Sequence, residues 1–142
     1  MQALGQVWGR IDPQAPDLRE TATLLETPTL YGAQTLVDVW RGCSLGFVVG
    51  RDIPSRPLSG VLRNLAVFEP IEEGTDFLVR LAGTALLRRF GRDISGTKMS
   101  ELYASDTFER RREWLLDAIR TSRPVIHDIE MQHGNRMPLR FE

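Results

Sequence analysis

The chain has 142 residues, which is enough for one domain of ordinary size and too few for two. Hydrophobic residues make up 42% and charged residues 26%, a globular balance that argues against disorder. Because 18 basic residues nearly cancel 19 acidic ones, the usual electrostatic reason to expect a nucleic acid partner is absent.

The chain contains one cysteine, Cys43, so no disulfide can form within it, which fits a reducing compartment. Residues 1–10 lack a charged segment followed by an apolar run, so no signal peptide is visible. The strongest apolar runs, such as residues 47–49, are far too short to cross a bilayer. We therefore expect a cytoplasmic protein without a membrane partner.

Residues 1–32 are expected to form a weakly structured leader, and residues 33–142 the domain. The leader is turn-rich at residues 11–17, and Pro28 breaks the helical pattern that precedes it. A short helix from Asp17 to Glu26, with Asp17 as its N-cap, is the one element predicted there.

A helix of about ten residues is predicted from Ala33 to Arg41, followed by Gly42 and Gly46 as stop signals. A loop carrying Pro54 follows. The helix has more large apolar side chains than a lone surface helix needs, which indicates an interface. The predicted dimer contacts are Leu36, Val37 and Trp40.

A β-hairpin is predicted next, with strands over 65–71 and 77–82 and a turn at residues 73–76. Alternation places Phe77, Val79 and Leu81 on one face and Arg80 on the other, where a surface salt bridge is expected.

The predicted helices lie in the middle of the chain. Thr84 is the expected N-cap of a helix over 85–90, and residues 97–102 form one further helical turn. Asp106 and Glu109 form a capping-box pattern that opens a helix ending at Thr121. Its arginine run, 110–112, is flanked by glutamates and is interpreted as a solvated face.

A second hairpin is predicted at the end, with a turn at residues 133–135. Strands at both ends with helices between them predict an α+β fold, in which helices cover one side of an antiparallel sheet. The side chains expected on one face of each of the last two strands are Val125, His127, Ile129 and Met131, and Met137, Leu139 and Phe141.

This order of elements resembles a PAS domain. Residues 78–84, L-V-R-L-A-G-T, and 89–96, R-F-G-R-D-I-S-G, are similar to a PAS subgroup common in alphaproteobacteria, which carries R-L-A-G-T and F-G-R-D-x-x-G motifs. The helix with Trp40 and the R-D-I-P loop at 51–54 resemble the opening of that subgroup. The similarity extends over about residues 33–142.

One departure from the family concerns the sheet. A PAS sheet has five strands, and the pattern predicts four, so the last strand of the fold is expected to be absent. Either the chain is truncated, or the leader or a partner covers the open edge.

The resemblance implies a pocket between the sheet and the helices, which family members use for haem, flavin, small metabolites or nothing. It also implies dimerisation and a signalling partner. No cofactor is indicated by the residues themselves. The side chains expected to line the pocket are Val79, Leu81, Leu86, Phe90, Leu102, Leu115, Ile119 and His127.

Several segments partly match motifs of other chemistry. Residues 42–46 match G-x-S-x-G, but a helix leads into them where a hydrolase needs a strand. Residues 91–98 differ from a P-loop because Thr97 precedes Lys98. His127 lies on an apolar strand face, where a hydrogen-bonded buried histidine is favoured over a ligand or cofactor contact. Neither histidine has metal-ligand spacing, so no metal is expected.

The hypothesis is therefore a non-catalytic PAS-type sensory or interaction module that acts as a homodimer. Two alternatives stay open. A small α+β enzyme of the hotdog or cystatin-like type would need a convergent acid–base pair in its pocket, and the sequence shows none. A structural adaptor would have a filled core and no ligand.

Overall fold

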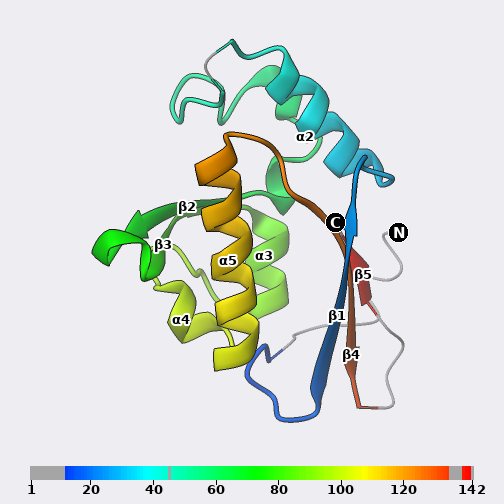
Figure 1. The fold of residues 1–142 in the computed structure, drawn as a ribbon, viewed down its shortest axis with the longest axis vertical. Coiled ribbons are helices and arrows are strands. Elements are labelled where there is room, and N and C mark those ends of the chain that lie inside the picture. Colours follow the sequence, from blue (N-terminus) through cyan, green and yellow to red (C-terminus); the bar gives the residue numbers. More distant parts are fainter. Residues whose placement is uncertain (1–11, 45, 135–138, 142) are drawn as a thin grey trace.

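A computed structural model describes residues 12–44, 46–134 and 139–141 (Figure 1). The helices are α2 (Tyr31–Arg41), α3 (Thr84–Phe90), α4 (Met99–Leu102) and α5 (Ser105–Thr121). The strands are β1 (Leu18–Leu25), β2 (Ala66–Ile71), β3 (Asp76–Ala82), β4 (Ile126–His133) and β5 (Leu139–Phe141). Short 3-10 helices occupy Arg56–Leu58, Leu62–Asn64 and Glu72–Gly74.

The strands form two antiparallel sheets, one with the order β1-β4-β5 and one that pairs β2 with β3. The α+β class and both predicted hairpins are confirmed. The strands were predicted to form a single sheet, and they form two. The predicted turn residue Asn135 and the strand residue Met137 lie outside the described residues.

The leader contributes a strand, so the helix predicted from Asp17 to Glu26 is wrong. β1 pairs with β4 over its whole length, from Leu18 opposite His133 to Leu25 opposite Ile126. Half-buried Leu18, Glu20 and Ala22 alternate with exposed residues, which is a strand period and not a helix period. The described chain thus holds five strands, one more than the pattern predicted.

Two predicted helix starts are also wrong, that of α3 by one residue and that of α5 by two. α3 begins at Thr84 itself, with Gly83 as its N-cap residue. α5 begins at Ser105 after Ala104, and no side chain caps it. The carboxylate of Asp106 accepts a hydrogen bond from the amide of Thr107, so the predicted capping box does not form.

A β-bulge changes the faces of β3. Val67 lies opposite Leu81 and Phe68 lies opposite Val79, so Arg80 has no partner residue in β2. The extra residue shifts the alternation beyond it. Ala82 packs against the Val79 cluster, whereas Leu81 is 37% exposed, so the expectation that Leu81 continues the face of Val79 is wrong. Arg80 pairs with exposed Glu69, as expected.

The F-G-R-D-I-S-G turn is hydrogen-bonded to β3. The amide of Gly96 donates to the Val79 carbonyl at 2.8 Å, and the amide of Val79 donates to the Thr97 carbonyl at 3.0 Å. Ile94 from this turn is 1% exposed and packs against Val79. Gly91 and Gly96 have φ values of 71° and 81°, which glycine adopts readily. The motif therefore has a structural role.

Helix α5 lies between the two sheets (Figure 1). On one side, Arg112 donates a hydrogen bond to the Gly74 carbonyl in the β2–β3 turn at 3.4 Å. On the other side, Arg110 and Arg111 pair with Glu20 of β1. Contacts from one helix therefore connect two sheets that share no strand.

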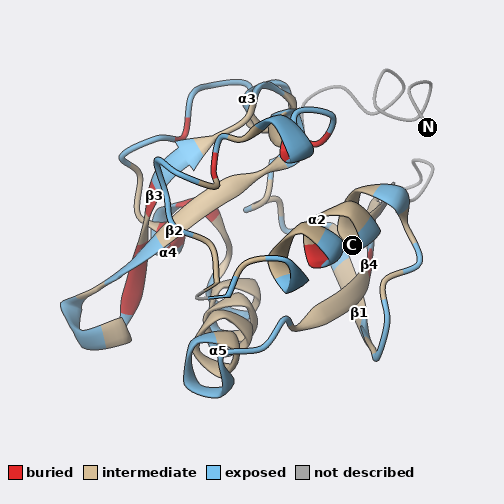
Figure 2. Cartoon of the chain, turned by 90° about the horizontal axis from the view of Figure 1, so that it is seen from above, coloured by how far each residue is buried: buried red, intermediate tan, exposed pale blue. Residues whose placement is uncertain are grey.

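Two clusters of buried side chains form within the described residues, and buried residues are marked along β3 and α4 in Figure 2. One cluster lies against α2 and consists of Ile53, Leu58 and Val61. The other lies between β3, the 91–96 turn and α4, and consists of Val79, Ile94 and Leu102.

Candidate functional site

The predicted pocket residues do not all meet. Val79 and Leu102 belong to one buried cluster, and Phe90 packs against it. Leu86 and Leu115 are half-buried, while Leu81 and Ile119 are exposed, Ile119 at 55%. Val79 and Leu102 are thus core residues, with exposures of 0% and 2%.

A second group of residues gathers around Arg111 of α5. Its guanidinium carbon lies 5.4 Å from the ring centroid of Tyr103, 5.3 Å from that of Trp114 and 5.6 Å from that of Phe141. These distances are within the range of cation–π contacts. Tyr103 and Trp114 are near Arg111 in the sequence, whereas Phe141 comes from β5 at the end of the described chain. The fold therefore completes this group, which we call the Arg111 cluster.

Glu20 of β1 is the described acidic partner of this cluster. Its side chain is 2% exposed and accepts hydrogen bonds from Arg111 at 2.8 Å and from Arg110 at 3.1 Å. A carboxylate this deeply buried is stable only when it is paired and hydrogen-bonded. The run of arginines expected on a solvated face therefore contributes two of its members to a buried ion-pair group.

His127 lies beside the cluster, stacked on Trp114. The two ring centroids are 3.8 Å apart and the ring planes differ by 18°. Burial, and after it the positive charge of Arg111, lowers the pKa of His127 below its usual value. The stack connects β4 with α5.

Arg89 of α3 places a second half-buried guanidinium group beside the Arg111 cluster. It lies 5.0 Å from the centroid of the Phe141 ring, which Arg111 also approaches. Burial lowers the pKa of Arg89; Tyr103 opposes this shift, and Arg111 adds a smaller lowering. In the described part of the chain, no hydrogen bond or ion pair reaches the Arg89 side chain.

Tyr103 is positioned against both arginines. Burial raises the pKa of its hydroxyl, and the charges of Arg111 and Arg89 oppose that shift. Its ring also contacts Phe90 edge to face at 6.2 Å. The Arg111 cluster therefore brings two guanidinium groups close to the phenol of Tyr103 and to the rings of Trp114 and Phe141.

The predicted dimer contacts on α2 are largely covered by their own chain. Leu36 packs against the cluster of Ile53, Leu58 and Val61, and Val37 is 7% exposed. Trp40 is half-buried, and its indole nitrogen lies 3.8 Å from the position that a Cβ at Gly46 would occupy. An interface on this helix stays a prediction.

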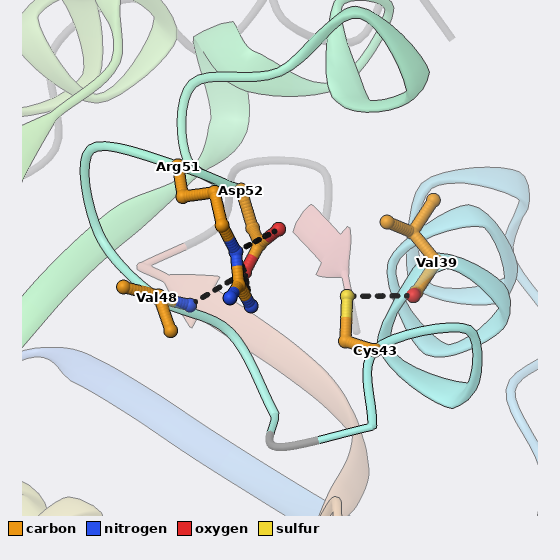
Figure 3. Close-up of polar contacts among 5 residues, drawn as sticks. All are labelled: Val39, Cys43, Val48, Arg51 and Asp52. Atoms are coloured by element: carbon orange, nitrogen blue, oxygen red, sulfur yellow. Dashed lines mark hydrogen bonds and ion pairs between the residues drawn. The ribbon is translucent and has the colours of Figure 1, made fainter.

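The loop after α2 is ordered by Asp52 (Figure 3). Its carboxylate accepts hydrogen bonds from the Val48 amide at 2.8 Å and from Arg51 at 2.7 Å. The Arg51 and Val48 donors lower the pKa of Asp52. On the helix side, the Cys43 thiol donates to the Val39 carbonyl at 3.3 Å. These contacts give R-D-I-P a local structural role.

Two further searches cover only the described residues. They contain no group of three or more histidine, cysteine, aspartate or glutamate side chains placed to hold a metal ion. None of their helices combines the length and the apolar character that crossing a membrane requires.

Sequence reasoning missed Glu20, Arg89 and Asp76. Asp76, assigned to a turn, is 6% exposed and accepts hydrogen bonds from the amide and hydroxyl of Ser100, which ties β3 to α4. The alternation of Leu18, Glu20 and Ala22 could have indicated an inward-facing glutamate. Nothing local to Arg89 distinguishes it from its exposed neighbour Arg88.

Comparison with known proteins gives one finding. The family model described as PAS domain matches residues 34–142, which is more than half of the chain. No curated protein and no solved structure matches it.

Proposed function

Because the chain belongs to the PAS domain family, we propose that it is a non-catalytic sensory or interaction module that binds a small ligand or a protein partner. We place it in the subgroup with R-L-A-G-T and F-G-R-D-x-x-G motifs, and expect a homodimer that acts in bacterial signal transduction in the cytoplasm. The two motifs would then serve the scaffold, since Gly83 and Ile94 are packed in it.

The observation that supports binding is the Arg111 cluster. Arg111 contacts rings from the residue after α4, from α5 and from β5, and half-buried Arg89 contacts the β5 ring; described residues pair only one of these two arginines with a carboxylate. Burying charge without a partner destabilises a fold. A site that retains such charge is a candidate for a binding function.

The alternative of a ligand-free adaptor has its own support. Glu20 pairs with Arg110 and Arg111 within the chain, and Val79 in the second core cluster is 0% exposed. In that case the α2 surface, and no small molecule, would carry the function.

Native mass spectrometry of the protein purified from cells tests the proposal. We expect either added mass from a co-purifying small molecule or a dimer that dissociates on dilution. A small molecule supports the sensory form of the proposal, and a ligand-free dimer supports the interaction form. A strictly monomeric chain without added mass, which also captures no partner from its source cells, contradicts both.

A further inference from the structure

The inference starts from the outer edge of β1. On one side this strand pairs with β4 over its whole length, and no other described strand pairs with it on the opposite side. Among the described residues, no backbone hydrogen bond outside that ladder involves residues 19–25. An edge strand of this kind presents a row of unpaired amide and carbonyl groups, to which another strand can add.

The other described edges are short, covered or interrupted. The outer edge of β3 is bonded to residues 96–98, and β5 has three described residues. β2 contains Pro70, which has no amide donor, and a bulge interrupts its pairing. β1 is eight residues long and contains no proline or lysine. It therefore lacks most of the features by which natural proteins prevent strand addition.

The two charged residues of β1 do not block its edge. Arg19 is exposed near one end of the strand. Glu20 points inward, where Arg110 and Arg111 of α5 neutralise it. The remaining residues of the strand are apolar or threonine, and Leu24 is 69% exposed. The middle of the strand thus offers an uncharged edge.

The register of the β1–β4 ladder shows which backbone groups face outward. The Gly134 amide donates to the Asp17 carbonyl at 3.5 Å, in the same register that places Leu18 opposite His133. Hydrogen-bonded and non-hydrogen-bonded pairs alternate along an antiparallel ladder. Residues 19, 21, 23 and 25 therefore direct their amides and carbonyls toward β4. Glu20, Ala22 and Leu24 direct theirs toward the free edge.

We propose that the outer edge of β1 pairs antiparallel with β1 of a second copy of this chain, with Ala22 opposite Ala22 and Glu20 opposite Leu24. This proposal rests on the proposed homodimer and names a surface that holds it together. The same strand serves both copies, as a two-fold interface requires. Each of these outward-facing pairs exchanges two hydrogen bonds, and the two β1-β4-β5 sheets become one continuous sheet.

The side chains of β1 are complementary to themselves in this register. With Ala22 on the two-fold axis, exposed Thr21 lies opposite Thr23 of the second copy, once on each side of the axis. Threonine favours strands, and cross-strand threonine pairs stabilise them. No charged residue lies opposite a like charge, and exposed Leu24 gains a neighbouring strand. The sequence of the edge therefore fits a second copy of itself.

Neighbouring registers are less favourable. Centring the pair on Thr21 would need the amide of Leu18, which already donates to the Ala15 carbonyl at 3.1 Å. Centring it on Glu20 would place two glutamates opposite each other, and like charges in that position destabilise a sheet. The register with Ala22 on the axis avoids both costs.

The first test measures association and hydrogen exchange of the full chain. We expect sedimentation velocity at protein concentrations up to about 0.5 mM to show a monomer–dimer equilibrium, which detects dissociation constants on the order of 1 mM or tighter. In hydrogen exchange followed by NMR, the amides of Ala22 and Leu24 should exchange more slowly as the protein concentration rises. The amides of Thr21 and Thr23 should be protected at every concentration, because β4 binds them.

Two double variants test the register. Thr21→Lys with Thr23→Lys places like charges opposite each other across the two-fold axis, and we expect dimerisation to weaken about tenfold. Thr21→Lys with Thr23→Glu changes the same two exposed positions but places opposite charges there. We expect it to dimerise within about threefold of the unmutated chain, or more tightly. Circular dichroism and urea unfolding establish that both are folded.

Ala22→Pro tests the backbone pairing. The amide of Ala22 faces the free edge, so proline removes a donor to the second copy and none to β4. We expect dimerisation to weaken by about tenfold or more, because both copies lose a hydrogen bond at the axis.

The proposal is overturned if the unmutated chain stays monomeric at these concentrations, if the two double variants dimerise equally, or if exchange at Ala22 does not depend on concentration. A dimer that Trp40→Glu dissociates and the β1 variants leave intact also overturns it, and α2 then carries the association. The proposed function survives each of these results when native mass spectrometry finds a ligand or a dimer. That function fails separately, when the chain is monomeric, ligand-free and without a partner.

Discussion

At the scale of single residues, Gly83 shows why its motif needs glycine. A Cβ at this position would lie 2.3 Å from the Arg63 carbonyl oxygen and 2.4 Å from that of Leu62, which are backbone atoms that cannot rotate away. The amide of Gly83 also donates to the Leu65 carbonyl at 2.8 Å. We expect Gly83→Ala to lower the free energy of unfolding by about 1–3 kcal/mol, measured by urea denaturation.

Gly60→Ala is the matched control for that change. A Cβ at Gly60 would meet no atom within 4 Å. We expect a change of less than about 0.5 kcal/mol. Equal stability of the Gly83→Ala and unmutated chains would show that the close approach of Arg63 is absent in solution.

The second prediction at this scale concerns the pH dependence of His127. Burial lowers its pKa in the folded chain below the ordinary value of 6.5. As pH falls through 6.5, the unfolded chain therefore binds a proton that the folded chain does not, so the free energy of unfolding decreases. Above that window the group has no effect. We expect His127→Phe, which keeps an aromatic ring against Trp114, to lose less stability than the unmutated chain when the pH is lowered from 7.5 to 5.5, a window of about two pH units around that pKa.

His133→Gln is the control, because His133 takes no part in the Trp114 stack. Its Nε2 atom lies 3.0 Å from the Asp17 carboxylate. Urea unfolding at several pH values distinguishes the two histidines. A pH dependence that His127→Phe leaves unchanged would rule out the assigned role.

Sequence reasoning about single residues succeeded where the signal was local. The glycines of the 91–96 turn and the surface pair of Arg80 were expected from turn geometry and strand alternation, and both are found. It failed for Arg111, because a glutamate on each side of residues 110–112 is typical of a solvated helix. The buried partner, Glu20, is about ninety residues away in the chain.

At the scale of elements, the two errors in strands have different causes. Residues 18–25 can satisfy either a short helix or a strand, and only pairing with β4, far along the chain, decides between them. The bulge at Arg80 leaves no mark in the sequence, because the residues on both sides of it are compatible with a regular strand. Non-local pairing thus determined what local propensity left open.

The prediction that belongs to a whole element concerns α2 and Trp40. If α2 mediates dimerisation, Trp40→Glu places a charge in the interface and removes an aromatic anchor. Such a loss commonly costs ~2 kcal/mol or more, which is at least a tenfold weaker dimer. Sedimentation velocity should then show a folded monomer. An unfolded chain would instead assign Trp40 to the core beside Gly46.

Tyr31→Glu is the control on the same helix. Tyr31 is 73% exposed and lies nine residues before Trp40, which places it on the opposite side of α2. We expect this variant to leave folding and association unchanged. A Trp40→Glu chain that stays both folded and dimeric would contradict the interface and the core assignment together.

At the scale of the whole molecule, the elements were easier to predict than their arrangement. Turn residues and apolar alternation indicated both hairpins, and the helical spacing of apolar residues indicated α2. The single expected sheet is instead two sheets, connected by contacts of α5 with Gly74 on one side and Glu20 on the other. These contacts join segments that are distant in sequence, and the helix pattern of α5 does not identify their partners. The same distance hid the contacts of Arg111 with Glu20 of β1 and Phe141 of β5.

The last prediction tests whether the Glu20 ion pair contributes to the stability of the whole chain. Glu20 is the buried contact through which β1 reaches α5, with its side chain 2% exposed. Glu20→Gln keeps the shape of the side chain and leaves Arg110 and Arg111 without a charged partner. Breaking a buried pair in this way costs about 3–5 kcal/mol. We expect a corresponding loss in the free energy of unfolding, together with faster hydrogen exchange at the amides of β1 and β4.

Glu69→Gln provides the comparison, because it removes an exposed partner of an arginine. The Glu69 and Arg80 side chains are 47% and 56% exposed, so the pair is well solvated. Its loss should cost less than about 1 kcal/mol. A large difference between the two glutamates would establish β1 as part of the cooperative fold. If Glu20→Gln is as mild as Glu69→Gln, and β1 exchanges rapidly in the unmutated chain, the leader docks too weakly to matter for stability. In that case the acidic counter-charge of the Arg111 cluster is not fixed by folding.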